Sequence, residues 1–275
     1  MIALLIAPDF DEATHYTKKW IQEVKKELVN QDYQLIYLTD EVKREKVENT
    51  IKVHNPDLIV FYNHGNEDCW YGSSTEKIID LDNVDLLKNK EVYTLSCLSA
   101  KKLGVEAFKK GCKVFIGYKD VFSFNTDEED LFKEAANSGI IKKIRDKVSW
   151  EEAFNFMKQK YNECIEKAQS FWTKTWLAWD RDCLVKYDEN QPPETKCILR
   201  KMLLRILGIK ALKLTRIFFA GLILFLVGYG VALHDFAHQV YELKGTVLSL
   251  EGGYVGFSLI MIGFLVMIYE LWDYL

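Results

Sequence analysis

Several signals that identify common classes of protein are missing from this 275-residue sequence. It has six cysteines but no C-x-x-C pair and no accompanying histidine cluster, which argues against a structural zinc site. The first apolar segment is followed by Pro8-Asp9-Phe10-Asp11 instead of a glycine-rich turn, which disfavours a nucleotide-binding domain. The basic residues do not form a nucleic-acid footprint, so we expect no nucleic-acid partner.

The amino-terminal segment also lacks the basic residues with which a secretory signal begins. Residues 1–8 are apolar, but Asp9 and Asp11 follow at once. We therefore expect a first β-strand here rather than a targeting segment. Reduced thiols in the cytosol are then expected for the six cysteines, which are Cys69, Cys97, Cys112, Cys164, Cys183 and Cys197.

Up to residue 187, short apolar runs alternate with helix-like segments. The runs predict strands over 2–7, 33–38, 58–63, 92–96, 113–118 and 183–187. The segments around them predict helices over 13–29, 42–54, 100–110, 126–138 and 150–175. Repeated strand–helix units build a mostly parallel sheet with helices on both faces. We therefore expect an α/β domain over residues 1–190, bounded by a polar linker that contains prolines.

Two uncharged apolar runs lie further along the chain, over residues 217–233 and 254–269. Because about 20 apolar residues cross the hydrocarbon of a bilayer, these runs with their flanks predict a hairpin of two transmembrane helices, at about 216–234 and 254–272. Glycines in both runs suit close helix contact, which would also allow a homo-oligomer to form through the hairpin. His234 and His238 have no evident third ligand, so we expect no metal site there.

A basic segment precedes the first apolar run. Residues 196–216 include seven Lys or Arg and no Asp or Glu. Basic residues mark the cytoplasmic side of a membrane helix, so we expect the amino-terminal domain in the cytoplasm and the lipid bilayer as a partner. Residues 191–215 would then form a linker and a basic juxtamembrane helix on anionic lipid.

Two of the predicted strands end on a reactive side chain. The run over 58–63 ends at His64-Gly65, and the run over 92–96 ends at Cys97. The carboxyl ends of parallel strands lie at one edge of a sheet, so we expect His64 and Cys97 to be neighbours there. A turn into a helix after Cys97 would favour its thiolate through helix amides. A single reactive cysteine with a histidine distant in sequence is the pattern of a cysteine nucleophile.

This order of motifs resembles the caspase-like (clan CD) cysteine peptidases, which include metacaspases, gingipains, clostripain and CHAT domains. The likeness covers about residues 1–190, and 115–118 and 149–154 are similar to gingipain-type and CHAT-type members. It implies that Cys97 attacks the carbonyl of a protein or peptide substrate and that His64 gives the departing amine a proton. It also implies that the N–H groups of Gly65 and Cys97 hold the oxyanion, with no metal or organic cofactor.

One position departs from the family pattern. Caspases have Gln and metacaspases Asp two residues before the nucleophile, in the specificity pocket, whereas this chain has Leu95. The P1 preference is therefore not inherited. We expect Asp68 and Asp120 to favour a basic P1 residue, with ordinary solvated loop acids as the alternative, and Trp70 to contact substrate, with loop packing as the alternative.

Three functions remain open at this point. The first is a membrane-anchored cytosolic cysteine endopeptidase that is switched on by a signal, which the intact His64–Cys97 pair favours. The second is a catalytically inactive caspase-like scaffold or binding module at the membrane. The third is an unrelated flavodoxin-like domain on a membrane tether, which the missing glycine-rich turn disfavours.

Overall fold

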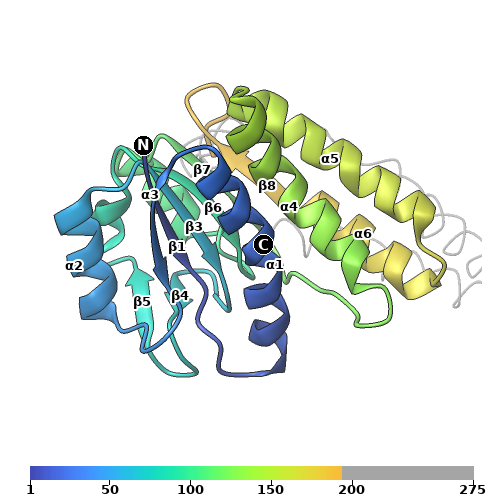
Figure 1. Ribbon diagram of the computed structural model, residues 1–275, viewed down its shortest axis with the longest axis horizontal. Helices are drawn as coiled ribbons and strands as arrows, with labels where there is room; N and C mark the ends of the chain where they lie inside the picture. The colour runs from blue at the N-terminus through green and yellow to red at the C-terminus, as the bar shows by residue number, and fades with distance from the viewer. Residues whose placement is uncertain (194–275) are drawn as a thin grey trace, which may run out of the picture. The chain divides into compact units, whose positions relative to one another are not determined.

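A six-stranded sheet forms the centre of the computed structural model, which describes residues 1–193 (Figure 1). Five strands are parallel to their neighbours, and the sixth, β8, runs antiparallel to β7. Across the sheet they are β2 (Gln34–Leu38), β1 (Ile2–Ile6), β3 (Leu58–Tyr62), β6 (Glu91–Leu95), β7 (Val114–Tyr118) and β8 (Leu184–Tyr187). The predicted mostly parallel sheet is confirmed. The predicted juxtamembrane helix and both predicted membrane spans lie outside the described residues.

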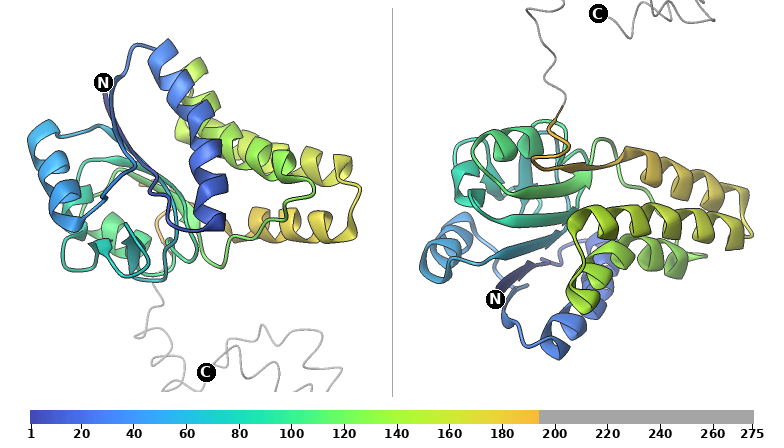
Figure 2. Two further views of the ribbon diagram at one scale, coloured as in Figure 1. Left: turned by 60° about the horizontal axis from the view of Figure 1, so that its bottom comes forward. Right: turned by 90° about the horizontal axis from the view of Figure 1, so that it is seen from above.

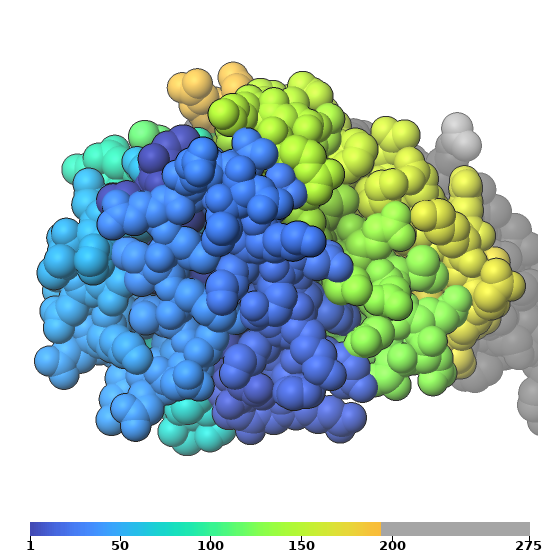
Figure 3. All heavy atoms as spheres, in the orientation of Figure 1, coloured from blue at the N-terminus to red at the C-terminus, as the bar shows by residue number. Residues whose placement is uncertain are grey.

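Helices cover both faces of this sheet (Figure 2). One face carries α2 (Arg44–His54), α3 (Leu103–Lys109) and the short 3-10 helix η1 (Val84–Leu87). The opposite layer is built from α1 (Glu12–Asn30), α4 (Glu129–Asp146), α5 (Trp150–Lys167) and α6 (Phe171–Cys183). At the surface of that layer α1 and α4 pack side by side (Figure 3).

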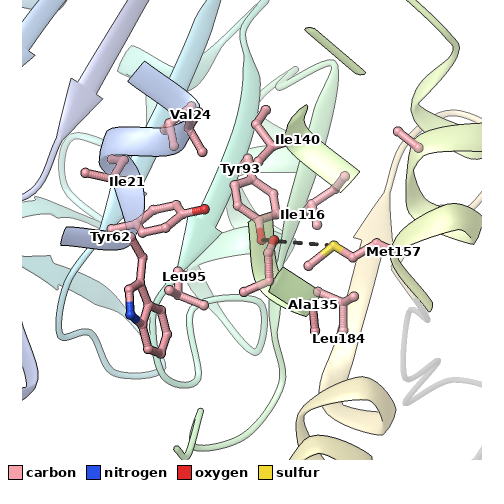
Figure 4. Close-up of a cluster of buried hydrophobic side chains, with 14 of the residues drawn as sticks. Ile21, Val24, Tyr62, Tyr93, Leu95, Ile116, Ala135, Ile140, Met157 and Leu184 are labelled. Carbon is pink, nitrogen blue, oxygen red and sulfur yellow. Dashed lines mark hydrogen bonds between the residues drawn. The ribbon is translucent and has the colours of Figure 1, made fainter. Parts of the chain in front are cut away.

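The strands are apolar on both faces because each face has its own core. Along β3, Val60 and Tyr62 point into the core under α1 and α4, and Ile59 and Phe61 point into the core under α2 and α3. Buried hydroxyl groups in this first core have partners: Tyr62 donates to Asn137, and Tyr93 donates to the Ala136 carbonyl. The Tyr93 hydroxyl also lies 4.0 Å from the Met157 sulfur (Figure 4).

Helix α1 follows β1 because its sequence has both a start signal and an apolar stripe. Asp11 is its N-cap: Oδ1 of Asp11 accepts from the Thr14 backbone N–H at 2.9 Å, and the Thr14 hydroxyl accepts from the Asp11 N–H at 3.0 Å. Trp20, Val24 and Leu28 recur at helical spacing and are buried. The helix thus begins at a fixed point directly after β1.

The structure differs from the predicted elements most clearly in three places. The helix expected over 150–175 is two helices, because Ala168 leaves helical geometry and the carboxylate of Glu128 accepts from the N–H groups of Gln169 and Ser170. Helix α4 continues to Asp146, beyond the predicted end at 138. A two-stranded hairpin, β4 (Cys69–Tyr71) and β5 (Lys77–Asp80), was not predicted.

Within residues 1–193, no helix combines the length and apolar character that crossing a membrane requires. The apolar runs predicted to span a membrane are in the part of the chain outside this range.

Candidate active site

His64 and Cys97 follow two strands that are direct neighbours. In the parallel pair of β3 and β6, Tyr62 lies beside Leu95, and the Asn63 N–H donates to the Leu95 carbonyl at 3.2 Å. His64 and Cys97 each come two residues after this pair, which places both at the carboxyl edge of the sheet. Because side chains two apart along a strand share a face, the pair is aimed toward the α1 side.

This edge is also where the strand order reverses. From β1 the chain moves to β2 on one side and then crosses to β3 on the other. In open α/β sheets, ligands bind in the crevice at such a switch point. Asp11 follows β1 and His64 follows β3, so their side chains border that crevice from two sides.

Asp11 holds the imidazole of His64. Its Oδ2 lies 2.7 Å from Nε2 of His64, and the amide of Asn63 donates to the Pro8 carbonyl at 2.6 Å, which keeps the loop after β1 beside β3. Burial raises the pKa of Asp11, but hydrogen bonds from Thr14 and His64 outweigh it, so the pKa lies below its ordinary value. An ionised Asp11 accepts a hydrogen bond from the Nε2–H group, which leaves the lone pair of neutral His64 on Nδ1.

Sequence reasoning missed Asp11 as a partner of His64. The available signal was its position: it is an N-cap residue immediately after a buried strand, at the same edge of the sheet as His64. An N-cap carboxylate has one oxygen bound to the helix and a second oxygen free to bind a neighbour.

Cys97 is half-buried, and its thiol donates to the Phe122 carbonyl at a distance of 3.8 Å. Burial raises the pKa of this thiol above its ordinary value. The expected stabilisation of the thiolate by helix amides was wrong, because residues 97–102 form turns and α3 begins only at Leu103. In this state no hydrogen bond joins His64 to Cys97 within the described part of the chain.

The turn after Cys97 is strained. Leu98 has φ +58°, a left-handed conformation that costs a non-glycine residue on the order of 1 kcal/mol. Two backbone hydrogen bonds to the end of β7 hold the turn: the Leu98 N–H donates to Asp120, and the Ala100 N–H donates to Tyr118, both at 3.0 Å. The backbone at Cys97 is therefore fixed by the neighbouring strand.

Gly65 is required by close packing between the two strand ends. A Cβ at this position would lie 2.2 Å from Oγ of Ser96 and 3.3 Å from the Cys97 carbonyl oxygen. Any side chain would therefore push the His64 and Cys97 segments apart. The roles of the Gly65 and Cys97 N–H groups as oxyanion donors stay a prediction.

A cavity of about 610 Å³ opens beside His64. Its walls come from the first turn of α1, the loop after β7 and helix α6, and include Asp11, Ala13, Tyr16, Phe122, Phe124 and Trp176. Cys97 is not among the lining residues, but its thiol donates to the carbonyl of Phe122, which is one of them. The candidate base therefore lines the cavity, and the candidate nucleophile contacts a residue of its wall.

Two of the residues predicted to bind substrate are in the interior. Trp70 is 0 % exposed and stacks on Phe61 with ring centres 4.6 Å apart, so the expected substrate contact was wrong and packing explains this tryptophan. Leu95 is 2 % exposed in the core under α1 and is likewise not available to a substrate.

The two acidic residues predicted to bind a basic P1 side chain, Asp68 and Asp120, lie outside the cavity beside His64. The Asp120 carboxylate accepts from the Val121 N–H at 2.8 Å, and the Asp120 carbonyl holds the turn after Cys97. Asp68 precedes β4 and lies 4.0 Å from the Lys77 ammonium. Neither is among the residues that line the cavity beside His64. Among residues 1–193, no group of three or more His, Cys, Asp or Glu is arranged to hold a metal ion.

No protein-family model and no curated protein matches this sequence, but solved structures match its fold. The structure described as the complex of Porphyromonas gingivalis RgpB pro- and mature domains has a TM-score of 0.51 at 15 % identity, over 70 % of this chain and 47 % of that chain. The Arg specific cysteine proteinase gingipain R (RGPB) has a TM-score of 0.48 at 13 % identity, over 69 % and 46 %. The chain thus spans about half the length of these proteins. The amino-terminal α/β domain of this chain shares its fold with the RgpB structure.

Proposed function

We propose that this chain is a cysteine endopeptidase in which Cys97 is the nucleophile, His64 the acid and base, and Asp11 the residue that orients His64. The observation that carries the proposal is the placement of His64 and Cys97 after adjacent parallel strands at one edge of the sheet, beside a cavity that His64 lines, in a fold shared with gingipain R. Each of the three side chains would then have a separate chemical task.

In the proposed reaction, Sγ of Cys97 attacks the carbonyl carbon of a peptide bond and its proton passes to Nδ1 of His64. His64 then gives that proton to the departing amine, and an acyl-enzyme remains on Cys97. Water loses a proton to Nδ1, attacks the thioester and releases the acid, and the proton returns to the sulfur. Asp11 stabilises the imidazolium that forms twice in this cycle.

The tetrahedral intermediate carries a negative oxygen that needs donors. The N–H groups of Gly65 and Cys97 are proposed for this role, and such a donor is worth about 3 kcal/mol of transition-state stabilisation. Gly65 has no side chain of its own to block the N–H group, and the space on its Cβ side is filled by Oγ of Ser96.

In the free protein the thiol is bound to the Phe122 carbonyl, and His64 is bound to Asp11. The nucleophile is therefore a protonated thiol until substrate enters. Catalytic hydrogen bonds are often absent or long before substrate binds, so the proton transfer from Cys97 to His64 belongs to the complex with substrate.

Cleavage of a peptide library, followed by amino-terminal sequencing of the products, tests this proposal. The full chain is compared with Cys97→Ala and with Cys112→Ala as a matched control. Burial raises the pKa of Cys112 to about 12, so its thiol is inert. We expect cleavage by the full chain and the control, and none by Cys97→Ala; equal cleavage by all three would end the proposal.

We further propose that residues 216–234 and 254–272 anchor this peptidase in a membrane, with the amino-terminal domain in the cytoplasm and with oligomers forming through the hairpin. The sequence supports this by its two uncharged runs and the basic segment before them. The chain should stay with membranes after extraction at alkaline pH, while its amino-terminal domain is digested by protease added from the cytoplasmic side.

A catalytically inactive scaffold is the second candidate, and the raised pKa of Cys97 favours it. The flavodoxin-like alternative shares the order of the five parallel strands, so that order does not separate the two folds. The antiparallel β8 and the likeness to gingipain R favour the caspase-like fold. Library cleavage separates the endopeptidase from both alternatives.

A further inference from the structure

The cavity beside His64 has aromatic walls. Tyr16 comes from α1, Phe122 and Phe124 from the loop after β7, and Trp176 from α6. All four are partly exposed, and all four pack against the core under α1. The cavity is therefore an apolar recess at the mouth of the site, supported from below by the core.

These walls are fixed in place before any ligand binds. The Phe124 ring meets the Trp20 ring edge-on with centres 4.9 Å apart, and Tyr16 meets Phe124 at 5.6 Å. Phe122 packs in the same way on Tyr118 at 5.0 Å. Edge-to-face aromatic pairs are favourable, so the recess needs little ordering when a ligand enters.

Helix α6 is tied to the loop that carries Phe122 and Phe124. The indole N–H of Trp179 donates to the Val121 carbonyl at 2.9 Å, and the Ser123 N–H donates to the Asp180 carboxyl at 3.0 Å. The Asn125 amide donates to the Thr173 hydroxyl at 2.8 Å. Trp176 lies one helical turn from these attachment points, so its indole is held at the edge of the recess.

The recess offers little to a charged side chain. Both carboxylate oxygens of Asp11 are already bonded, one to Thr14 and one to His64. Glu12 is exposed at the rim, where solvent screens its charge and an ion pair is worth at most about 1 kcal/mol. The expected basic P1 preference through Asp68 and Asp120 therefore has no counterpart in the lining.

From this lining we infer that the recess receives an aromatic or bulky aliphatic side chain of the substrate, from one of the two residues on the amino side of the scissile bond. The inference rests on the proposed peptidase function. Phe122 connects the recess to the proposed nucleophile, because Phe122 lines the recess and its carbonyl accepts a hydrogen bond from the Cys97 thiol. The cavity volume of about 610 Å³ is within the range of ligand sites and holds a large side chain with its backbone.

The test uses the full chain and a series of peptidyl acyloxymethyl ketones, which alkylate a nucleophilic cysteine. Phe, Leu, Ala, Arg or Asp stands at the position next to the ketone, and a second series varies the residue before it. The rate of adduct formation at Cys97 is measured by intact-mass and peptide mass spectrometry. We expect the Phe and Leu probes to react at least tenfold faster than the Ala, Arg and Asp probes at one of these positions.

Three variants locate that preference. Trp176→Ala should lower the ratio of the Phe-probe rate to the Ala-probe rate about tenfold, and Trp176→Phe should keep most of that ratio. Thr126→Phe narrows the recess and should shift the preference toward the Ala probe. Phe171→Ala is the matched control: this aromatic is on the same helix, is 72 % exposed and does not line the recess. Its rates should equal those of the unaltered chain.

The outcomes separate the inference from the function on which it rests. Three outcomes would overturn the recess assignment and leave the peptidase proposal standing. The probes could label Cys97 at equal rates, or the Arg or Asp probe could react fastest. The ratio of Phe to Ala rates could also be identical in Trp176→Ala and Phe171→Ala. Failure of every probe to label Cys97 above the other cysteines would overturn both.

Discussion

Asp11→Asn removes the charge that faces His64 while it leaves the start of α1 intact. The Oδ2 atom of Asp11 lies 2.7 Å from Nε2 of His64, and Oδ1 accepts from the Thr14 N–H at 2.9 Å. Asparagine caps helices as well as aspartate does, so the bond to Thr14 survives. We expect the free energy of unfolding at neutral pH to change by no more than about 0.5 kcal/mol.

The same change should have a large effect on catalysis. A neutral amide cannot stabilise the imidazolium, and its N–H group would favour the tautomer with the proton on Nδ1. The equivalent change in a Ser-His-Asp triad lowers kcat by about 10⁴. The side chain of His64 is 42 % exposed, so water replaces part of the lost charge. We expect kcat/KM to fall by about 10²–10³, or about 3–4 kcal/mol.

The assay is kcat/KM on the best peptide from the library, with thermal unfolding followed on the same samples. Asp9→Asn is the matched control, since Asp9 is on the same loop but is paired with His15 at 3.2 Å and Lys18 at 3.4 Å. Its activity should stay within about twofold of the unaltered chain. Equal activity in the two variants, or a loss that only follows the loss of folded protein, would refute the orienting role of Asp11.

Three further predictions concern the surroundings of the site. Gly65→Ala should lower stability by about 1–3 kcal/mol and abolish most of the labelling of Cys97, because the new Cβ would lie 2.2 Å from Oγ of Ser96. Thermal unfolding of the Gly65→Ala, Ser96→Ala double variant checks this, since removing the Ser96 hydroxyl relieves the clash and should restore part of the lost stability. Burial raises the pKa of Asp180, so the folded state keeps the carboxyl proton at a pH where the unfolded state releases it. The stability that this group contributes therefore falls as the pH rises above the ordinary pKa of aspartate. The advantage of Asp180→Asn in urea unfolding should therefore grow as the pH rises above about 4, and a pH-independent difference would contradict it. Trp70→Ala should cost about 3–5 kcal/mol of stability without changing probe preference; a change in preference with unaltered melting would revive the substrate contact.

The strand ends could be predicted from sequence because the signals are local. Uninterrupted apolar runs before His64 and Cys97 identify buried parallel strands, and the rule for parallel sheets brings their carboxyl ends to one edge. The start of α1 was also within reach, through the spacing of its apolar residues.

Features that depend on distant contacts could not be predicted in this way. The break between α5 and α6 has no glycine or proline, and Glu128 on a remote loop binds the freed N–H groups. From the sequence Trp70 is predicted to be a loop residue, whereas in the structure its ring stacks on Phe61 and Phe115. The pKa of Cys97 depends on burial, which follows from the packed structure and not from the residues beside it in sequence.

The central claim is that His64 activates Cys97 for attack on a peptide carbonyl. Its most direct test is the rate at which a peptide ketone alkylates each cysteine of the full chain, with and without His64→Ala. We predict that Cys97 reacts fastest and that its rate falls about 10²-fold or more in the variant. Similar rates at Cys97 and the other cysteines, unchanged by His64→Ala, would contradict the account.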